Sequence, residues 1–427
     1  MKLDGVTGEV LWSQHYASEG AENESVYGMA LDASDDVIVT GRMYETGRED
    51  ELVTIKFAGV DGAFQWESKE GGAARLDDRA LSVDCGGTSD PVVAGLVQNA
   101  DGSASLMVVR YAGASGGILW TDLQPGIVND LSGDGWVAVD AAGDAVACWK
   151  MWGGATSYDI RVVKYDGADG SVLWQRTYNH AGASADDPSH MILDAAGDVL
   201  IAGVTAGNYL TVKLSGTDGA TLWSATYEGP QGWYDVANHV LAAPDGTVMV
   251  TGFSDGVGSG WDVATLAYDG ATGKHMWTAR WDGESGSTDE GRCLSLDPTG
   301  TRLYVSGYTY AAGTGMDELV LAYSLPVTSD AAAAPLPPAF LDAYPNPFNP
   351  RVTVDVRLDA PDSATLTVRD LRGREVAVLH AGDLPAGRSA FVWNGRDDAG
   401  RDQPAGVYVA ELRTGRGVSA RKLSLVR

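Results

Sequence analysis

Short segments of alternating apolar and polar residues recur along the first three quarters of the chain, with turn residues between them. One set reads "YGMALDA", "DVIVTGR", "ELVTIKF" and "GAFQWES", and an equivalent later set reads "GWVAVDA", "DAVACWK", "YDIRVVKY" and "GSVLWQRTY". The segments are rich in Val, Ile, Leu, Tyr and Thr, as β-strands are. Asp and Gly in connections such as "DAAGD" and "YDGATG" favour tight hairpin turns. The pattern predicts units of four antiparallel strands.

These units recur at a regular period, which is marked by a Gly four residues before a Trp. The pairs are Gly8/Trp12, Gly62/Trp66, Gly116/Trp120, Gly170/Trp174, Gly219/Trp223 and Gly273/Trp277. Successive tryptophans are 54, 54, 54, 49 and 54 residues apart. Four-stranded units at such a period are the blades of a β-propeller. We expect each Gly to adopt a positive φ and each Trp to be buried between neighbouring blades.

The strand count predicts a ring of six blades. Five complete blades span about Tyr27–Ser68, Ala80–Leu123, Gly135–Tyr178, His190–Tyr227 and Val236–Trp281. The stretch Arg292–Leu325 supplies only three strands, so we expect the N-terminal segment Gly8–Tyr16 to pair with the strand that contains Leu319–Tyr323 and to close the last blade. Met1–Asp4 then has no place in the ring. Together with the lack of a signal peptide, this favours a truncated N-terminus.

A different pattern follows the propeller. Residues 327–340 are rich in Pro and Ala, which is typical of a semi-rigid linker. Beyond them, Val352, Val354, Val356 and Leu358 alternate with polar residues, and several similar segments follow. We therefore expect an all-β chain with a propeller at 1–326, a linker at 327–340 and an Ig-like β-sandwich at 341–427.

Charge separates the two predicted domains. The chain has a net charge of −28; residues 1–339 carry 17 Lys and Arg against 47 Asp and Glu, whereas residues 340–427 carry 13 against 11. So acidic a propeller argues against nucleic acid as a partner. No apolar run is long enough for a membrane helix. Cys85, Cys148 and Cys293 are scattered, which predicts neither a disulfide framework nor a zinc site.

The repeat resembles a known family. "KLDGVTGEVLW" and "YDGATGKHMW" are similar to the tryptophan-docking repeats of quinoprotein-like propellers, and the whole unit resembles secreted bacterial β-propeller repeats over residues 1–325. Quinone-dependent dehydrogenases of this fold use an adjacent Cys–Cys pair and a calcium held by Glu, Asn and Asp. No two cysteines are adjacent here. We therefore expect no quinone and no other cofactor.

The C-terminal segment carries a second resemblance. "YPNPFNP", "DLRGREV", "LPAGRSAFVWNGRDDAGRDQPAGVYVAEL" and the basic end "RKLSLVR" resemble the C-terminal sorting domain of type IX secretion cargo and the Ig-like domain of flagellar hook-capping proteins. The resemblance implies that secretion machinery of the outer membrane is a partner and that the protein is secreted or on the cell surface. A plain Ig-like spacer is the alternative. The sorting residues would be Tyr344, Pro345, Asn346, Pro347, Phe348, Asn349, Pro350, Arg421 and Lys422.

The longer and more varied loops are where a ligand is expected, because variable loops on a rigid scaffold usually carry binding. The candidate ligand-binding residues are Trp152, Trp233, Tyr234, Trp261, Trp281, Asp235 and Asp282. Aromatic rings beside carboxylates suit a glycan, and a protein is the other ligand considered. The alternative is that the tryptophans pack under the loops and the acids are solvated. The acids could instead hold calcium, but no D-x-D-x-DG loop is present, so we expect no metal.

No residue qualifies as catalytic, because the chain has no nucleophile elbow, P-loop or HExxH sequence. The leading hypothesis is therefore a non-enzymatic binding or scaffold protein. The rival is an extracellular enzyme that acts on polysaccharide through acids on the long-loop face. One further irregularity is Trp149, which replaces the Gly that ends the second strand in the other blades; it is either a recognition feature or a local repacking.

Overall fold

The computed structural model describes the chain except residues 5–6, 17–23, 45–49, 73, 75, 128–134, 155–156, 181–183, 233, 284–285, 312, 326–339, 345–347, 359–360, 371–373, 415–416 and 427. The chain forms two compact units, Met1–Ser324 and Leu325–Arg427. The regular elements of the described residues are strands. Among the residues that the structure describes, no helix has the length and apolar character needed to span a membrane.

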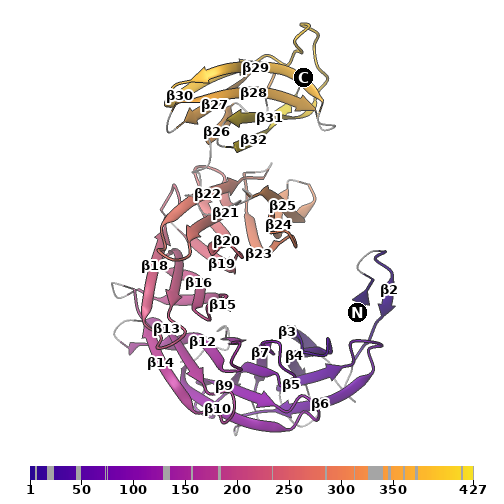
Figure 1. The fold of residues 1–427 in the computed structure, drawn as a ribbon, viewed down its shortest axis with the longest axis vertical. Coiled ribbons are helices and arrows are strands. Elements are labelled where there is room, and N and C mark those ends of the chain that lie inside the picture. Colours follow the sequence, from indigo (N-terminus) through magenta and orange to yellow (C-terminus); the bar gives the residue numbers. More distant parts are fainter. Residues whose placement is uncertain are drawn as a thin grey trace. The chain divides into compact units, whose positions relative to one another are not determined.

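The first unit is a row of antiparallel sheets that follow one another along the chain (Figure 1). Five sheets have four strands: β3–β6 (Glu24–Leu31, Val37–Tyr44, Asp50–Phe57, Phe64–Glu70), β7–β10 (Asp78–Asp84, Val92–Gln98, Ala104–Tyr111, Ile118–Ile127), β11–β14 (Gly135–Val139, Ala145–Trp152, Tyr158–Tyr165, Val172–Tyr178), β15–β18 (Asp186–Leu193, Val199–Thr205, Asn208–Leu214, Thr221–Tyr227) and β19–β22 (Asp235–Ala242, Thr247–Gly256, Gly260–Asp269, His275–Trp281). The sheet β23–β25 (Asp289–Leu296, Arg302–Ala311, Gly315–Ser324) has three strands. The first strand of each sheet contacts the first strand of the next, from β3 to β23. This confirms the prediction of propeller blades.

The predicted closure of the ring is wrong. β2 (Val10–Trp12) pairs with β1 (Lys2–Leu3) and not with β25, and within the described residues β25 is the edge of its sheet. Lys2 lies opposite Trp12 as Lys56 lies opposite Trp66, so "MKLD" is itself a third strand. A local hairpin closes a far shorter loop than a pairing between the two ends of the unit, and its entropic cost is smaller.

The Gly and Trp of each pair join neighbouring blades. All six glycines have φ between 70° and 74°, as expected. Each of Trp12, Trp66, Trp120, Trp174 and Trp223 donates its indole N–H to a Gly carbonyl of the next blade, over 2.8 to 3.1 Å. Their rings cover the next Gly so closely that a Cβ on Gly170 would lie 2.7 Å from Trp120. The four Trp between complete blades are 5 to 7% exposed, which confirms the expected burial, whereas Trp12 and Trp277 are half-buried.

A basic side chain on the third strand reinforces this contact. Lys164 Nζ lies 2.7 Å from Asp140 Oδ2 and donates to the same Gly216 carbonyl that Trp174 reaches. Asp144, the other acid of the turn, accepts the amide of Gly167. Equivalent ion pairs join Lys56 to Asp32 and Asp36, and Lys213 to Asp194 and Asp198. The short Asp-rich turns are therefore structural.

Trp149 is a local repacking. Its side chain is fully buried and lies opposite Gly135, on a first strand that pairs without a bulge. In the other blades the first strand bulges at this point, and the opposing Gly is needed because a Cβ on Gly41 would lie 1.9 Å from the Ser25 carbonyl oxygen. In this blade the Gly lies on the regular first strand, and the second strand has room for the large side chain of Trp149.

The second unit is a sandwich of two antiparallel sheets, as predicted. One contains β26 (Phe340–Tyr344), β27 (Val352–Leu358) and β30 (Gly387–Trp393); the other contains β29 (Glu375–Leu384), β28 (Asp362–Asp370), β31 (Gly406–Thr414) and β32 (Gly417–Leu425). Phe348 and Trp393 pack together in the core, with ring centroids 5.4 Å apart.

Candidate functional site

Three aromatic side chains gather at one end of the sheet β19–β22. Trp261, at the start of β21, stacks on Phe253 of β20 with ring centroids 4.3 Å apart, and Tyr234 lies 6.0 Å from Phe253. Phe253 is buried, Trp261 is half-buried, and Tyr234 is 46% exposed. We call Tyr234, Phe253 and Trp261 the aromatic group. A buried ring thus supports two partly exposed rings, which is a preorganised apolar surface.

Two of the other predicted aromatic residues, Trp152 and Trp281, do not join this group. Trp152 ends β12 in a different blade, is 45% exposed, and makes an edge-to-face contact with Tyr158. Trp281 ends β22, opposite Val263, and is half-buried. Trp233 lies outside the described residues. The structure therefore brings together two of the five predicted aromatic residues, Tyr234 and Trp261.

Asp235 is not a surface ligand, contrary to the prediction. It is fully buried, and its carboxylate accepts the backbone amides of Gly229 and Asp255. Buried acids also begin the first strands of other blades, at Asp78, Asp186 and Asp289. Each accepts the amide of the residue six positions earlier, at 2.6 or 2.7 Å. These acids hold the loop that enters the blade.

Burial, together with the nearby Glu51 and Asp77, raises the pKa of Asp78 to about 6, although the amides of Gly72 and Gln98 act to lower it. Burial also raises the pKa of Asp289, and the neighbouring carboxylate of Asp262 contributes to the rise. A carboxyl group in such a position resists ionisation unless a positive charge comes close.

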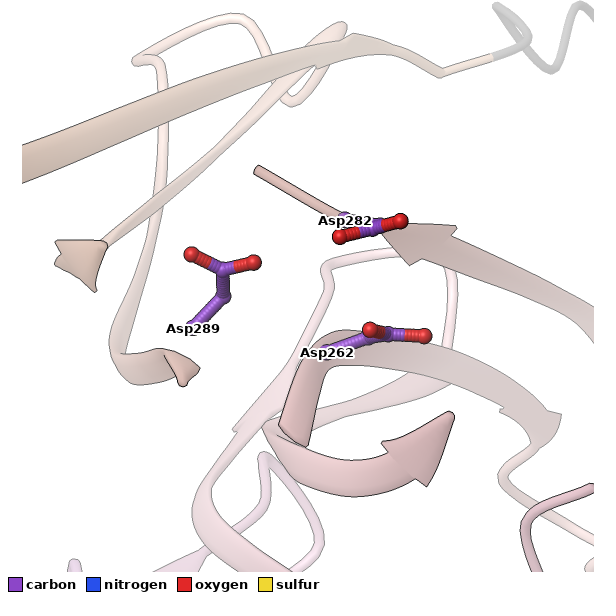
Figure 2. Close-up of side chains that lie close together, drawn as sticks. All are labelled: Asp262, Asp282 and Asp289. Carbon is purple, nitrogen blue, oxygen red and sulfur yellow. The ribbon is translucent and has the colours of Figure 1, made fainter. Parts of the chain in front are cut away.

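Asp289 belongs to a group of three carboxylates with Asp262 and Asp282 (Figure 2). One oxygen of each lies within 4.8 Å of the others. We call these three residues the carboxylate group. Asp262 lies near the start of β21, Asp282 follows β22, and Asp289 begins β23, so the group joins two successive sheets. Asp262 and Asp289 are buried, whereas Asp282 is exposed.

Arg280 neutralises one side of this group. Its Nη2 lies 2.8 Å from Asp262 Oδ2 and also donates to the carbonyl oxygens of Ser254 and Asp255. Its Nη1 donates to Tyr227 Oη of the preceding blade. Asp262 Oδ1, by contrast, is buried and has no hydrogen-bond partner.

Phe253, Asp262 and Arg280 were not among the residues predicted from the sequence. They lie inside regular strands, where an apolar or charged residue is normally assigned to packing. A signal for Asp262 was nonetheless available, because each of the five four-stranded sheets has a polar residue five positions before the residue that pairs with the blade Trp. These residues are Glu51, Ser105, Asp159, Asn208 and Asp262.

The predicted sorting residues fall into three sets. Phe348 is a core residue whose backbone bonds to Ser424 and Val426, so its side chain is not a surface signal. Asn349, Pro350 and Lys422 are exposed and Arg421 is half-buried. Pro345, Asn346 and Pro347 lie outside the described residues, as does the side chain of Tyr344.

Blades joined by Trp-to-Gly contacts define the first unit as a tryptophan-docking β-propeller. A family model described as outer membrane protein assembly factor BamB matches residues 104–322, just over half of the chain, and the chain belongs to this family. The model of the FlgD Ig-like domain matches residues 349–417. The β-propeller and Ig-like parts of the sequence resemblance are thus confirmed, and its sorting part stays a prediction.

Several solved structures are similar to this chain at low identity. BamB from Moraxella catarrhalis is 14% identical, with 78% of this chain and 83% of that chain covered and a TM-score of 0.42. PorZ, a surface component of the type IX secretion system of Porphyromonas gingivalis, is 14% identical, with coverage of 99% and 62% and a TM-score of 0.39. A quinohemoprotein alcohol dehydrogenase from Comamonas testosteroni is 13% identical, with coverage of 84% and 66% and a TM-score of 0.42. No curated protein matches the chain.

Proposed function

We propose that this protein is a non-enzymatic binding scaffold of the bacterial cell envelope or surface, and that the aromatic group of its propeller binds a glycan. The observation that carries the proposal is the stack of Trp261 on the buried Phe253, with Tyr234 exposed beside it. Flat rings held in place bind the apolar faces of sugars at a low entropic cost. The family's description as an outer membrane assembly factor supports an envelope location and a binding role.

The repeated contacts between blades support a scaffold. Indole-to-carbonyl bonds, Lys–Asp ion pairs and buried aspartates hold each sheet and the loops that enter it. Sites built on such rigid elements keep their geometry without a ligand.

The rival function, hydrolysis of a polysaccharide, has one observation in its favour. Asp262 and Asp289 lie close together, and the pKa of Asp289 is raised, as in the acid of a glycosidase pair. Asp289 is, however, fully buried and accepts bonds from Gly283 and Thr309. These bonds hold the loop that enters its blade and leave Asp289 without contact to solvent.

A glycan array followed by a reducing-end assay separates the two functions. We expect the chain to retain a class of glycans on the array and to release no reducing ends from them. Release of reducing ends that is lost in Asp289→Asn would establish the enzyme instead. Failure to retain any glycan would contradict the proposed ligand.

The C-terminal unit is proposed to direct secretion or surface attachment. Its separate core and its charge, near neutral beside an acidic propeller, support a separate role. Deletion of residues 340–427 should leave the propeller folded and abolish export in a host with type IX secretion. Unchanged export of the shortened chain would contradict the sorting role.

A further inference from the structure

The carboxylate group has the dimensions of a cation site. One oxygen each from Asp262, Asp282 and Asp289 lies within 4.8 Å of the others. Oxygen ligands lie at about 2.3–2.6 Å from a bound Ca²⁺, so two ligands of the same ion are separated by at most about 5 Å. The three oxygens therefore fit around a single ion. Among the residues that the structure describes, only these three acids form such a group.

A second observation is the unsatisfied oxygen of Asp262. This residue is 6% exposed, and its Oδ2 is paired with Arg280, but its buried Oδ1 has no hydrogen-bond partner. The carboxylate of Asp262 lies near those of Asp282 and Asp289 (Figure 2). Buried polar atoms are almost always partnered, and an exception requires an explanation such as an ion. A cation bound by both oxygens of the Asp262 carboxylate would give Oδ1 a partner.

The net charge of the side chains around the site indicates the charge of the ion that would balance it. Three ionised carboxylates and the guanidinium of Arg280 sum to a net charge of −2, which one divalent cation neutralises. The exposed Asp282 gives the ion a route from solvent.

We propose that Asp262, Asp282 and Asp289 bind one divalent cation, and that Ca²⁺ is the ion they suit best. The ligands are all hard oxygens, which Ca²⁺ and Mg²⁺ prefer to nitrogen or sulfur. They come from two strands and a loop, and such an irregular shell suits the flexible coordination of Ca²⁺ better than the strict octahedron of Mg²⁺. The ion would join the sheets β19–β22 and β23–β25.

The test uses the full chain after treatment with a chelator. Thermal unfolding is followed without metal and with about 5 mM CaCl₂ or MgCl₂, because a ligand of the folded state raises the midpoint by mass action. Tb³⁺ luminescence excited through tryptophan gives a second signal, since Trp281 directly precedes Asp282. We expect Ca²⁺ to raise the midpoint, Mg²⁺ to raise it less, and Ca²⁺ to displace the Tb³⁺ signal.

Asp282→Asn tests the site without disturbing the core, because Asp282 is exposed. We expect its apparent Ca²⁺ affinity to fall by at least about tenfold, a typical loss for a changed metal site. Asp77→Asn is the matched control, since it removes an exposed carboxylate beside the equivalent buried Asp78 of another blade. Its affinity should equal that of the parent. No Ca²⁺ effect on the parent, or an equal effect in Asp282→Asn, would overturn the proposal.

Discussion

Replacement of Trp120 by Ala tests whether the blade tryptophans hold the propeller together. Trp120 is 7% exposed, stacks on Tyr165 at 5.7 Å and covers Gly170. A buried Trp removes roughly 150–250 Å² from water, worth about 4–6 kcal/mol at 25 cal/mol per Å². The Gly167 carbonyl keeps a second donor, Arg110 Nη1 at 3.0 Å, so its desolvation adds little. We expect a loss of about 4 kcal/mol, within the usual range of about 3–5 kcal/mol for such a change.

The assay is urea unfolding followed by tryptophan fluorescence, which reports mainly on the propeller because Trp393 is the only Trp of the C-terminal unit. Trp152→Ala is the control, since Trp152 is 45% exposed and pairs only at its edge with Tyr158. It should cost less than about 1 kcal/mol. An equally small loss in Trp120→Ala, with an unchanged dependence on urea, would refute the role of the blade tryptophans.

Three further predictions concern the glycines, the lysines and the histidines. Gly116→Ala should destabilise the fold by about 2 kcal/mol or more, because its Cβ would lie 2.6 Å from Trp66. Gly102 has a similar positive φ but open space around it, so Gly102→Ala should cost only about 1 kcal/mol. Equal losses of the two variants in urea unfolding would contradict the contact between Gly116 and Trp66. Lys164→Met should lower the free energy of unfolding by about 3 kcal/mol in the same measurement, because it leaves Asp140 and Asp144 without their cation. If the difference between parent and variant disappears at high salt, the ion pair is only a surface pair. Burial lowers the pKa of His190 to about 3 and that of His239 to about 4. As the pH falls, these histidines are therefore protonated in the unfolded chain before they are protonated in the folded one, and stability should fall between about pH 6.5 and pH 4. His239→Gln should make this fall less steep in unfolding curves measured across that range.

The repeat was predictable because each blade solves the same packing problem with the same residues. The Gly and Trp spacing indicated a positive φ and a buried ring at each blade contact, and the structure has both at Gly116 and Trp120. The closure of the ring was not predictable from strand counts. "MKLD" and "ELVLAYSL" both read as third strands, and sequence pattern alone cannot decide which of them pairs with β2.

The candidate site was predictable only in part. Tyr234 and Trp261 were found because they interrupt the repeat in long loops. Asp235 was misassigned because a carboxylate that accepts two backbone amides has the same sequence signature as a solvated one. Asp262 was missed because it becomes a candidate only through its closeness to Asp289, which lies in the next sheet. Which residues of two sheets lie close together depends on the fold and is not visible in the sequence.

Titration of a glycan retained on the array into the parent chain and into Trp261→Ala tests the proposed function most directly. The stacking of a nucleobase on an aromatic side chain is worth about 1–3 kcal/mol. If a sugar loses a similar free energy of binding, its affinity becomes about 5- to 150-fold weaker. We predict that loss for Trp261→Ala, with Trp152→Ala unchanged and no product formed. Equal affinity of Trp261→Ala and the parent would contradict the claim that the aromatic group is the binding site.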